Sequence, residues 1–224
     1  MPSPWKNLPL TAPYVLPEDE VAIRAFNAKE MGTAYEIMLD QIPSPYIGKP
    51  DAPVLLLNLN PGYAPDLTSE ATQDAFARAA RTAMEHGDSE YPFYPLDPAL
   101  AGSAAGHEWW SLMLGPLIRA SGRSAQEVSR KIFCVEYFPY HSVKYSWNGD
   151  LLPSQRYSHD LVGTALAAGA RVIIMRSRKQ WEEAVPALKG HPRVCSLKNH
   201  QRTFISEGNM DPKAFAEIVN LVQG

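Results

Sequence analysis

Residues 53–60, PVLLLNLN, followed directly by Pro61 and Gly62, decide the fold that the sequence predicts. The run is almost continuously apolar, which is typical of a strand covered on both faces inside a parallel sheet. The Pro-Gly pair then favours a turn at the end of that strand. Residues 68–86 have the apolar spacing of a helix, so the segment predicts a strand–loop–helix unit.

Three further β-rich runs alternate with helix-like segments along the rest of the chain. These runs cover residues 132–138, 171–175 and 193–197. Helices are predicted over residues 108–120 and 154–168 and from Pro212 onward. Two more are predicted to begin at the capping boxes Ser124–Glu127 and Ser177–Gln180. This alternation predicts an α/β fold, a three-layer α/β/α sandwich with a mainly parallel four-stranded central sheet.

The chain length of 224 residues suits one domain. We expect an α/β/α core over residues 51–224 and an N-terminal helical extension, residues 1–50, packed on it. Prolines interrupt residues 91–105, which predicts a long loop rich in aromatic side chains. The loops that follow parallel strands gather at one edge of the sheet, so we expect the functional site there.

Several classes of protein are disfavoured by what the sequence lacks. No run of eighteen apolar residues is present, so no membrane span is expected, and the first ten residues do not resemble a secretory signal. We therefore expect a cytoplasmic protein. Two cysteines cannot hold an iron–sulfur cluster, the histidines are scattered, and phosphate-binding glycine motifs are missing. The expectation is that the protein has no metal and no cofactor.

The charge is unevenly distributed, although the net charge is only −3. Residues 1–117 carry a net −9 and residues 118–205 a net +8. Local lysine and arginine residues bind a phosphate backbone, so the basic segment makes DNA a candidate partner. The alternative is that the basic face interacts with solvent or with the acidic half of the chain.

The run from Asn58 to Gly62, Asn-Leu-Asn-Pro-Gly, resembles a motif of the uracil-DNA glycosylase superfamily. The mismatch-specific and thymine-specific branches carry Gly-Ile-Asn-Pro-Gly after the first sheet strand, and Asn58 replaces the first glycine. The order of elements over residues 50–222 is also similar. The second family motif, His-Pro-Ser or Asn-Pro-Ser, is replaced here by residues 198–202, KNHQR, where only Asn199 matches. The resemblance implies a glycosylase that removes a damaged or mismatched, uracil-type base from DNA.

Breaking an N-glycosidic bond requires a positioned water, hydrogen-bond donors toward the departing base and a surface on which the base stacks. We expect Asn60 to orient the water, although an amide cannot take its proton, which predicts slow turnover. His200 is expected to donate to the anionic base. The substrate-binding candidates are Gly62, Tyr63, Phe93, Tyr140, His141 and Asn199. The candidates for phosphate contacts are Lys144, Arg176, Arg178, Lys198 and Arg202.

Two other functions remain open at this point. The altered second motif favours a non-catalytic module of the same fold that binds nucleic acid or protein. The net negative charge favours a hydrolase or transferase that acts on a free nucleotide or another small metabolite. A DNA binder should lose affinity steeply as salt rises, whereas an enzyme of small metabolites should respond weakly.

Overall fold

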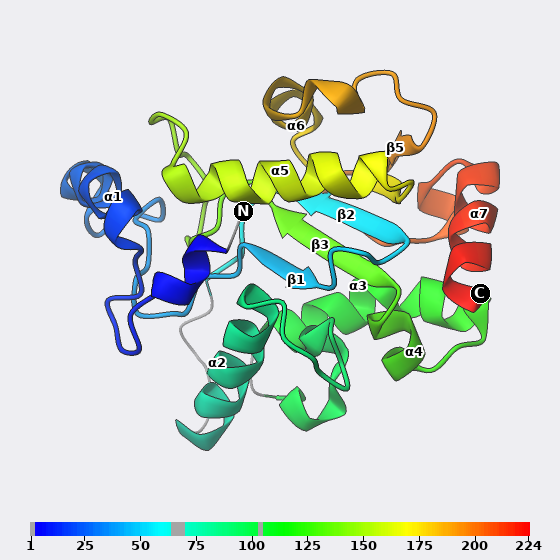
Figure 1. Ribbon diagram of the computed structural model, residues 1–224, viewed down its shortest axis with the longest axis horizontal. Coiled ribbons are helices and arrows are strands. Elements are labelled where there is room, and N and C mark those ends of the chain that lie inside the picture. The colour runs from blue at the N-terminus through cyan, green and yellow to red at the C-terminus, as the bar shows by residue number, and fades with distance from the viewer. Residues whose placement is uncertain (1–2, 64–69, 103–104) are drawn as a thin grey trace.

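The computed structural model describes residues 3–63, 70–102 and 105–224, and in these ranges one central sheet has helices on both of its faces (Figure 1). The sheet order is β1-β3-β2-β4-β5. The strands are β1 (Tyr46–Gly48), β2 (Val54–Asn58), β3 (Ile132–Glu136), β4 (Arg171–Ile174) and β5 (Val194–Ser196). Strands β2 to β5 pair in parallel, and β1 pairs antiparallel with β3. The α/β class is confirmed, but the four-stranded sheet is wrong, because the sheet is mixed and has five strands.

Strand β1 has no pattern by which the sequence analysis could find it. It is three residues long, too short for an alternation of apolar and polar side chains to be recognised. Gly48 adopts a φ of 99°, and a Cβ at this position would collide with the carbonyl oxygen of Ile132. A glycine is therefore required where β1 meets β3.

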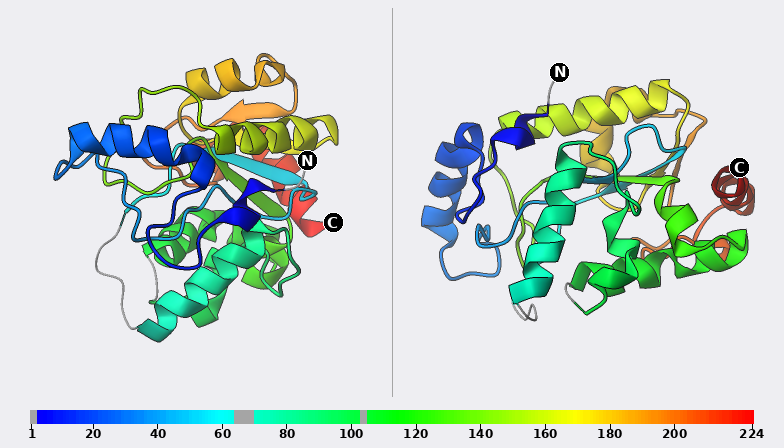
Figure 2. Two further views of the ribbon diagram at one scale, coloured as in Figure 1. Left: turned by 60° about the vertical axis from the view of Figure 1, so that its left-hand side comes forward. Right: turned by 60° about the horizontal axis from the view of Figure 1, so that its bottom comes forward.

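The helices are α1 (Pro17–Glu30), α2 (Glu70–Met84), α3 (Ala105–Ser121), α4 (Ala125–Ser129), α5 (Pro153–Ala167), α6 (Arg178–Ala184) and α7 (Pro212–Gln223). Helices α5 and α6 lie on one face of the sheet, and α2, α3 and α7 lie on the other (Figure 2). The ring of Trp181 in α6 packs 5.4 Å from that of His159 in α5. This arrangement is compatible with a three-layer α/β/α fold.

Most of the predicted helix signals hold, but one does not. The capping box at Ser124 forms with Glu127, and the carboxylate of Asp211 accepts from two amide groups at the start of α7. Ser177, in contrast, has a φ of 57° and makes no side-chain cap bond, so the second capping box is wrong. The chain turns sharply from β4 into α6 at this point. The expected helix start at residue 68 lies outside the described residues.

The segment before the sheet shares one hydrophobic core with the rest of the described chain. Asp19 of α1 accepts a hydrogen bond of 2.7 Å from the Tyr140 hydroxyl and one from the Ser154 amide. The stretch predicted as a long aromatic loop contains two short 3-10 turns, Tyr94–Leu96 and Pro98–Leu100. None of the helices in the described ranges has the length and apolar character needed to cross a membrane.

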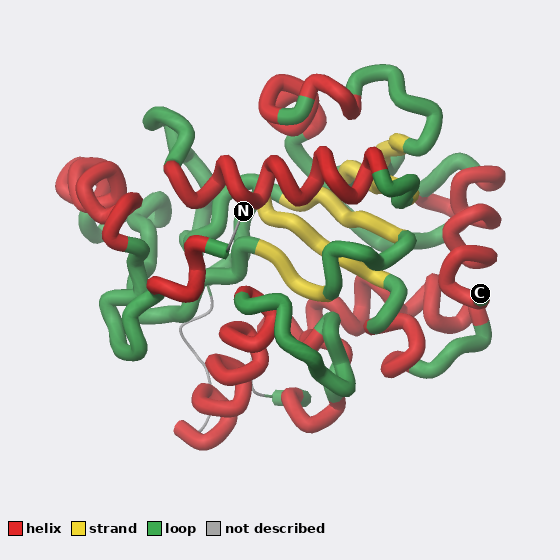
Figure 3. The backbone as a smooth tube through the Cα atoms, in the orientation of Figure 1, coloured by secondary structure: helices red, strands yellow, loops and turns green. Residues whose placement is uncertain are grey.

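The tube view shows how this arrangement positions a site (Figure 3). The four parallel strands point their carboxyl ends toward the same edge of the sheet, as predicted. Loops from β2, β3 and β4 leave the sheet there, and those from β2 and β3 contact the segment that precedes β1. Residues at the starts of α2 and α3 also border this edge.

Candidate functional site

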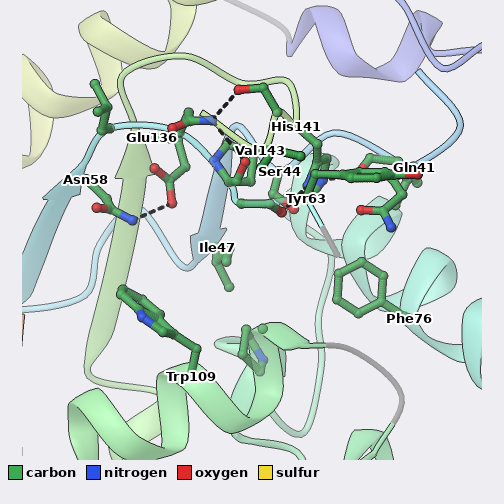
Figure 4. A pocket seen from close by; sticks show the side chains of 18 of the residues that line it. Gln41, Ser44, Ile47, Asn58, Tyr63, Phe76, Trp109, Glu136, His141 and Val143 are labelled. Carbon is green, nitrogen blue, oxygen red and sulfur yellow. Dashed lines mark hydrogen bonds between the residues drawn. The ribbon is translucent and has the colours of Figure 1, made fainter. Parts of the chain in front are cut away.

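A cleft of about 920 Å³ opens at this edge of the sheet. Its lining comes from the ends of β2 and β3, from the loops that follow β2, β3 and β4, from α2 and α3, and from the segment before β1. Figure 4 shows Asn58 and Glu136, which we call the floor of the cleft, with Trp109 below them in this view and Phe76 on the opposite side. The cleft lies where the order of strands predicts a site.

The side chain of Asn60 lies in this cleft, and the loop after β3 holds its amide group. Its Nδ2 donates to Ser142 Oγ at 3.0 Å and to the carbonyl oxygen of Pro61 at 3.1 Å. In the same loop, the backbone carbonyl oxygen of Ser142 accepts a hydrogen bond of 3.2 Å from the amide of Tyr63. The turn that starts with Pro61 is therefore tied to the strand beside it, and the orientation of Asn60 is fixed from two sides.

His141 lines the cleft but is used to hold its rim. Its Nδ1 lies 2.9 Å from the carbonyl oxygen of Gly62, and its Nε2 lies 2.9 Å from that of Ile42. Carbonyl groups only accept, so both bonds form together only when the imidazole carries two protons. Burial lowers the pKa of His141, although the two carbonyl groups oppose this effect. Because both ring nitrogens face backbone, His141 positions the loop of Gly62 rather than a substrate.

The floor of the cleft carries a buried polar pair that the sequence analysis did not single out. Asn58 and Glu136 are register partners at the ends of two neighbouring strands, and Asn58 Nδ2 donates to Glu136 Oε1 at 3.0 Å. Their exposed fractions are 5% and 4%. Asn58 Oδ1 and Glu136 Oε2 have no hydrogen-bond partner in the part of the chain that the structure describes. Buried polar atoms are normally hydrogen-bonded, so these two oxygen atoms mark the polar part of the cleft where a bonding partner from outside the chain is expected.

Burial is the main influence on the acidity of Glu136. It raises the pKa of this carboxyl group to about 8, against the hydrogen bond from Asn58 and the positive charge of Arg176, which both lower it. At neutral pH the carboxyl group is therefore mainly protonated. A protonated carboxyl group can donate a hydrogen bond from one oxygen while the other oxygen accepts.

The remaining walls of the cleft are largely apolar and aromatic. Trp109, on α3, is half-buried, and Ile47 and Phe76 also line the cleft (Figure 4). At the rim, the Tyr63 hydroxyl donates to Asp40 Oδ2 at 2.9 Å. Flat apolar surfaces next to a polar floor favour a planar ring that has polar groups on one edge.

Six of the predicted site residues line the cleft, namely Asn60, Gly62, Tyr63, His141, Lys144 and Arg176. Phe93 and Tyr140 do not. Phe93 is fully buried and packs edge-on against Trp110 at 4.9 Å, while the hydroxyl of Tyr140 is bonded to Asp19. Both rings fill the core, so neither has a free face on which a base can stack.

The other predicted residues lie outside the lining of the cleft. His200 is exposed, and its Nδ1 lies 3.1 Å from the carbonyl oxygen of Met175 at the end of β4. Asn199 Oδ1 accepts hydrogen bonds from the backbone amides of Gln201 and Arg202, and so forms a local turn. Arg178 is paired with Glu182 at 2.7 Å. Lys198 and Arg202 are exposed on the loop after β5.

Glu136, Asn58, Trp109 and Ser142 are among the cleft residues that sequence reasoning did not predict for the site. A signal existed for two of them, since Glu136 is the one charged residue in the run Ile132–Phe138, and Asn58 interrupts an apolar strand. A polar group in a buried strand requires a partner or a function. Trp109 and Ser142 carry no such signal, because tryptophan is ordinary in a core and serine in a turn.

No group of three or more histidine, cysteine, aspartate or glutamate residues that could hold a metal ion is found among the described residues. Comparisons of the chain with models of protein families, with curated proteins and with solved structures find no match. An assignment of function therefore depends on the geometry and chemistry of the cleft.

Proposed function

We propose that the protein is a base-excision glycosylase that hydrolyses the N-glycosidic bond of a uracil-type damaged or mismatched base in DNA, and that its mixed sheet belongs to a three-layer α/β/α fold of the uracil-DNA glycosylase type. One observation carries this proposal. Asn60, the buried Asn58–Glu136 pair and Trp109 share one cleft. These residues supply the three requirements of the reaction, which are a positioned water, polar contacts to the base and a stacking surface.

Asn60 is assigned to the attacking water. Its nitrogen is engaged by Ser142 and Pro61, so Oδ1 is the atom that accepts a hydrogen bond from the water. The water oxygen then bonds to the anomeric carbon of the sugar as the bond to the base breaks, and the electron pair of that bond leaves with the base. An amide cannot take the proton of the water, which passes to solvent, so turnover is slow.

The flipped base is held by stacking and by its polar edge. Trp109 offers an aromatic face inside the cleft and Tyr63 a second one at its rim. A stack on an aromatic side chain contributes about 1–3 kcal/mol per base, which offsets part of the cost of removing the base from the duplex. Lys144 and Arg176 line the cleft, and we assign them to the phosphates beside the flipped nucleotide.

Two carboxylates in the lining of the cleft favour a second candidate function, the hydrolysis of a free nucleoside. Asp40 and Asp74 also line the cleft, and negative charges there repel a phosphate backbone. A free nucleoside carries no phosphate and meets no such repulsion. The two candidates use the same residues for the bond that breaks, and they differ in whether DNA is needed.

The test is to incubate the protein with oligonucleotides that carry uracil, mismatched thymine or hypoxanthine, and with the free deoxynucleosides. Abasic sites are revealed by alkaline cleavage, and released bases by chromatography. We expect strand breaks that Asn60→Ala abolishes and that the control Asn148→Ala, in an exposed loop, leaves unchanged. Release from nucleosides alone supports the second candidate. DNA binding without release of any base contradicts both and indicates a binding module.

A further inference from the structure

The predicted proton donor, His200, does not line the cleft, so the departing base needs another donor. The floor holds the carboxyl group of Glu136, whose Oε1 accepts from Asn58 while Oε2 has no partner among the described residues. Beside it, Asn58 Oδ1 is also without a partner in those residues. Both side chains are more than nine-tenths buried, and both face the cleft (Figure 4).

We propose that Glu136, as a neutral carboxylic acid, holds the carbonyl oxygen of the base and protonates it as the base leaves, and that Asn58 Oδ1 accepts from the ring N–H next to that carbonyl. This role rests on the proposed glycosylase function. It makes Glu136 a catalytic residue, and it defines the ligand as a ring with adjacent C=O and N–H groups. Uracil and hypoxanthine have such an edge, whereas cytosine and adenine do not.

The chemical step balances. The bond between the anomeric carbon and the base nitrogen breaks, and its electron pair moves into the ring and onto the carbonyl oxygen. That oxygen takes the proton from Glu136 Oε2, so the base leaves as a neutral tautomer and Glu136 becomes a carboxylate. The water that bonds to the sugar releases one proton to solvent, and a solvent proton restores Glu136. A donor aimed at a developing negative charge lowers the barrier.

The surroundings of Glu136 keep it neutral. The thiol of Cys134 and the phenol of Tyr94 are buried neighbours whose own pKa values are raised, so both remain neutral. Arg176 is the cationic neighbour, and its effect on Glu136 is smaller than that of burial. Within the described ranges, Asn58 contributes the single hydrogen bond that the carboxyl group accepts.

The first experiment measures the binding of deoxyuridine, deoxyinosine, deoxycytidine and deoxyadenosine by calorimetry or NMR, which requires no catalysis. At pH 6.5 we expect deoxyuridine and deoxyinosine to bind at least ten-fold more tightly than the other two. Between pH 6.5 and 9.0 the affinity of the wild type for deoxyuridine should fall about ten-fold, because the neutral fraction of a group with a pKa of about 8 falls by that factor.

Glu136→Gln provides the decisive variant, because an amide donates and accepts like a protonated carboxyl group but does not ionise. It should bind deoxyuridine as the wild type does at pH 6.5 and should lack the additional ten-fold loss at pH 9.0. The loss that remains in this variant reports ionisation of the nucleoside itself. Glu183→Gln, an exposed residue of α6, is the matched control and should behave as the wild type. Thermal unfolding of each variant verifies the fold.

Single-turnover release of the base completes the test. Glu136→Gln should slow release at least a hundred-fold while the dissociation constant for the substrate oligonucleotide stays unchanged. If the wild type releases the base and Glu136→Gln releases it equally fast, the inference fails and the glycosylase function stands. If no base is released although deoxyuridine and deoxyinosine bind more tightly than the other two nucleosides, the glycosylase function fails and with it the proton transfer. Equal binding of all four nucleosides, or no binding at millimolar concentrations, overturns the assignment of the base edge.

Discussion

Asn60 donates a hydrogen bond of 3.0 Å to Ser142, and this contact joins the turn after β2 to the loop after β3. The two residues are far apart in the sequence, yet the loops meet because their strands are neighbours in the sheet. An isolated β-bridge between Gly62 and Ser142 strengthens the connection. The orientation of the Asn60 amide is therefore a property of the sheet edge and not of the Asn-Pro-Gly turn alone.

Ser142→Ala is expected to slow base release about five-fold, because it removes one of the two acceptors that orient Asn60, and a hydrogen bond of this kind contributes about 1 kcal/mol. Single-turnover kinetics on the best substrate oligonucleotide measure the effect. Ser146→Ala, in the same loop but outside the lining of the cleft, serves as the control. Equal rates for Ser142→Ala and the wild type would show that Asn60 needs no such support.

Asn60→Asp is expected to raise the rate of base release about ten- to a hundred-fold, because a carboxylate can take the proton of the water whereas an amide cannot. The Ser142 hydroxyl can turn its hydrogen toward the new carboxylate and keep it in place. The rate of this variant should fall at low pH as the carboxylate is protonated, which a pH profile records. If Asn60→Asp were as slow as Asn60→Ala, the water would not be at this position.

The parts of the fold that the sequence predicts are those in which neighbouring residues form a recognisable pattern. The buried run of β2, the capping box at Ser124 and the proline after Asp211 each determine their element through neighbouring residues. Strand β1 is determined by contacts made far along the chain, where Gly48 fits against β3. Ser177 has the spacing of a capping box, but the turn from β4 forces it into the left-handed region.

The candidate site divides in the same way. Asn60 could be placed at the cleft because it lies within two residues of the end of a strand, and the edge at which parallel strands end is known from topology. Phe93 could not be placed, because an aromatic residue in a proline-rich loop has the same sequence signal whether it packs inside or faces a ligand. Glu136 could be recognised as exceptional in its strand, but its partner Asn58 and its burial are tertiary facts.

The stability of the protein should depend on the protonation of Glu136. Its pKa is raised from 4.5 to about 8 on folding, so between these values the folded state binds more protons than the unfolded state, and the free energy of unfolding decreases as pH rises. The contribution is complete below pH 4.5 and is lost as pH passes 8. Glu136→Gln does not ionise, so its stability relative to the wild type should increase by roughly 3–5 kcal/mol from pH 4.5 to 9.

Urea unfolding of the wild type and of Glu136→Gln at a series of pH values measures this difference directly. Glu183→Gln, whose side chain is exposed, should show no such trend. A difference between Glu136→Gln and the wild type that does not change with pH would mean that Glu136 is ionised in the folded protein, and the proton donor would be lost with it.

Lys144→Gln should weaken the binding of DNA at low salt. It should also reduce the slope of log affinity against log salt by about one, as expected for the loss of one phosphate contact. Lys144 lines the cleft and is exposed. Arg178→Gln should have a smaller effect, because Glu182 already lies 2.7 Å from the Arg178 guanidinium. Arg193→Gln, at the opposite end of β5, should have none.

Fluorescence anisotropy with a labelled duplex at several salt concentrations distinguishes these outcomes. If the cleft accepts only nucleosides, all three variants should bind the DNA duplex weakly, and Lys144→Gln should not change the affinity. The reason is that the carboxylates of Asp40 and Asp74 then repel the DNA phosphates. A strong dependence on Arg193 would place the DNA at the other edge of the sheet, away from Asn60. The slope for Lys144→Gln therefore decides whether the phosphates lie where the flipped base can enter the cleft.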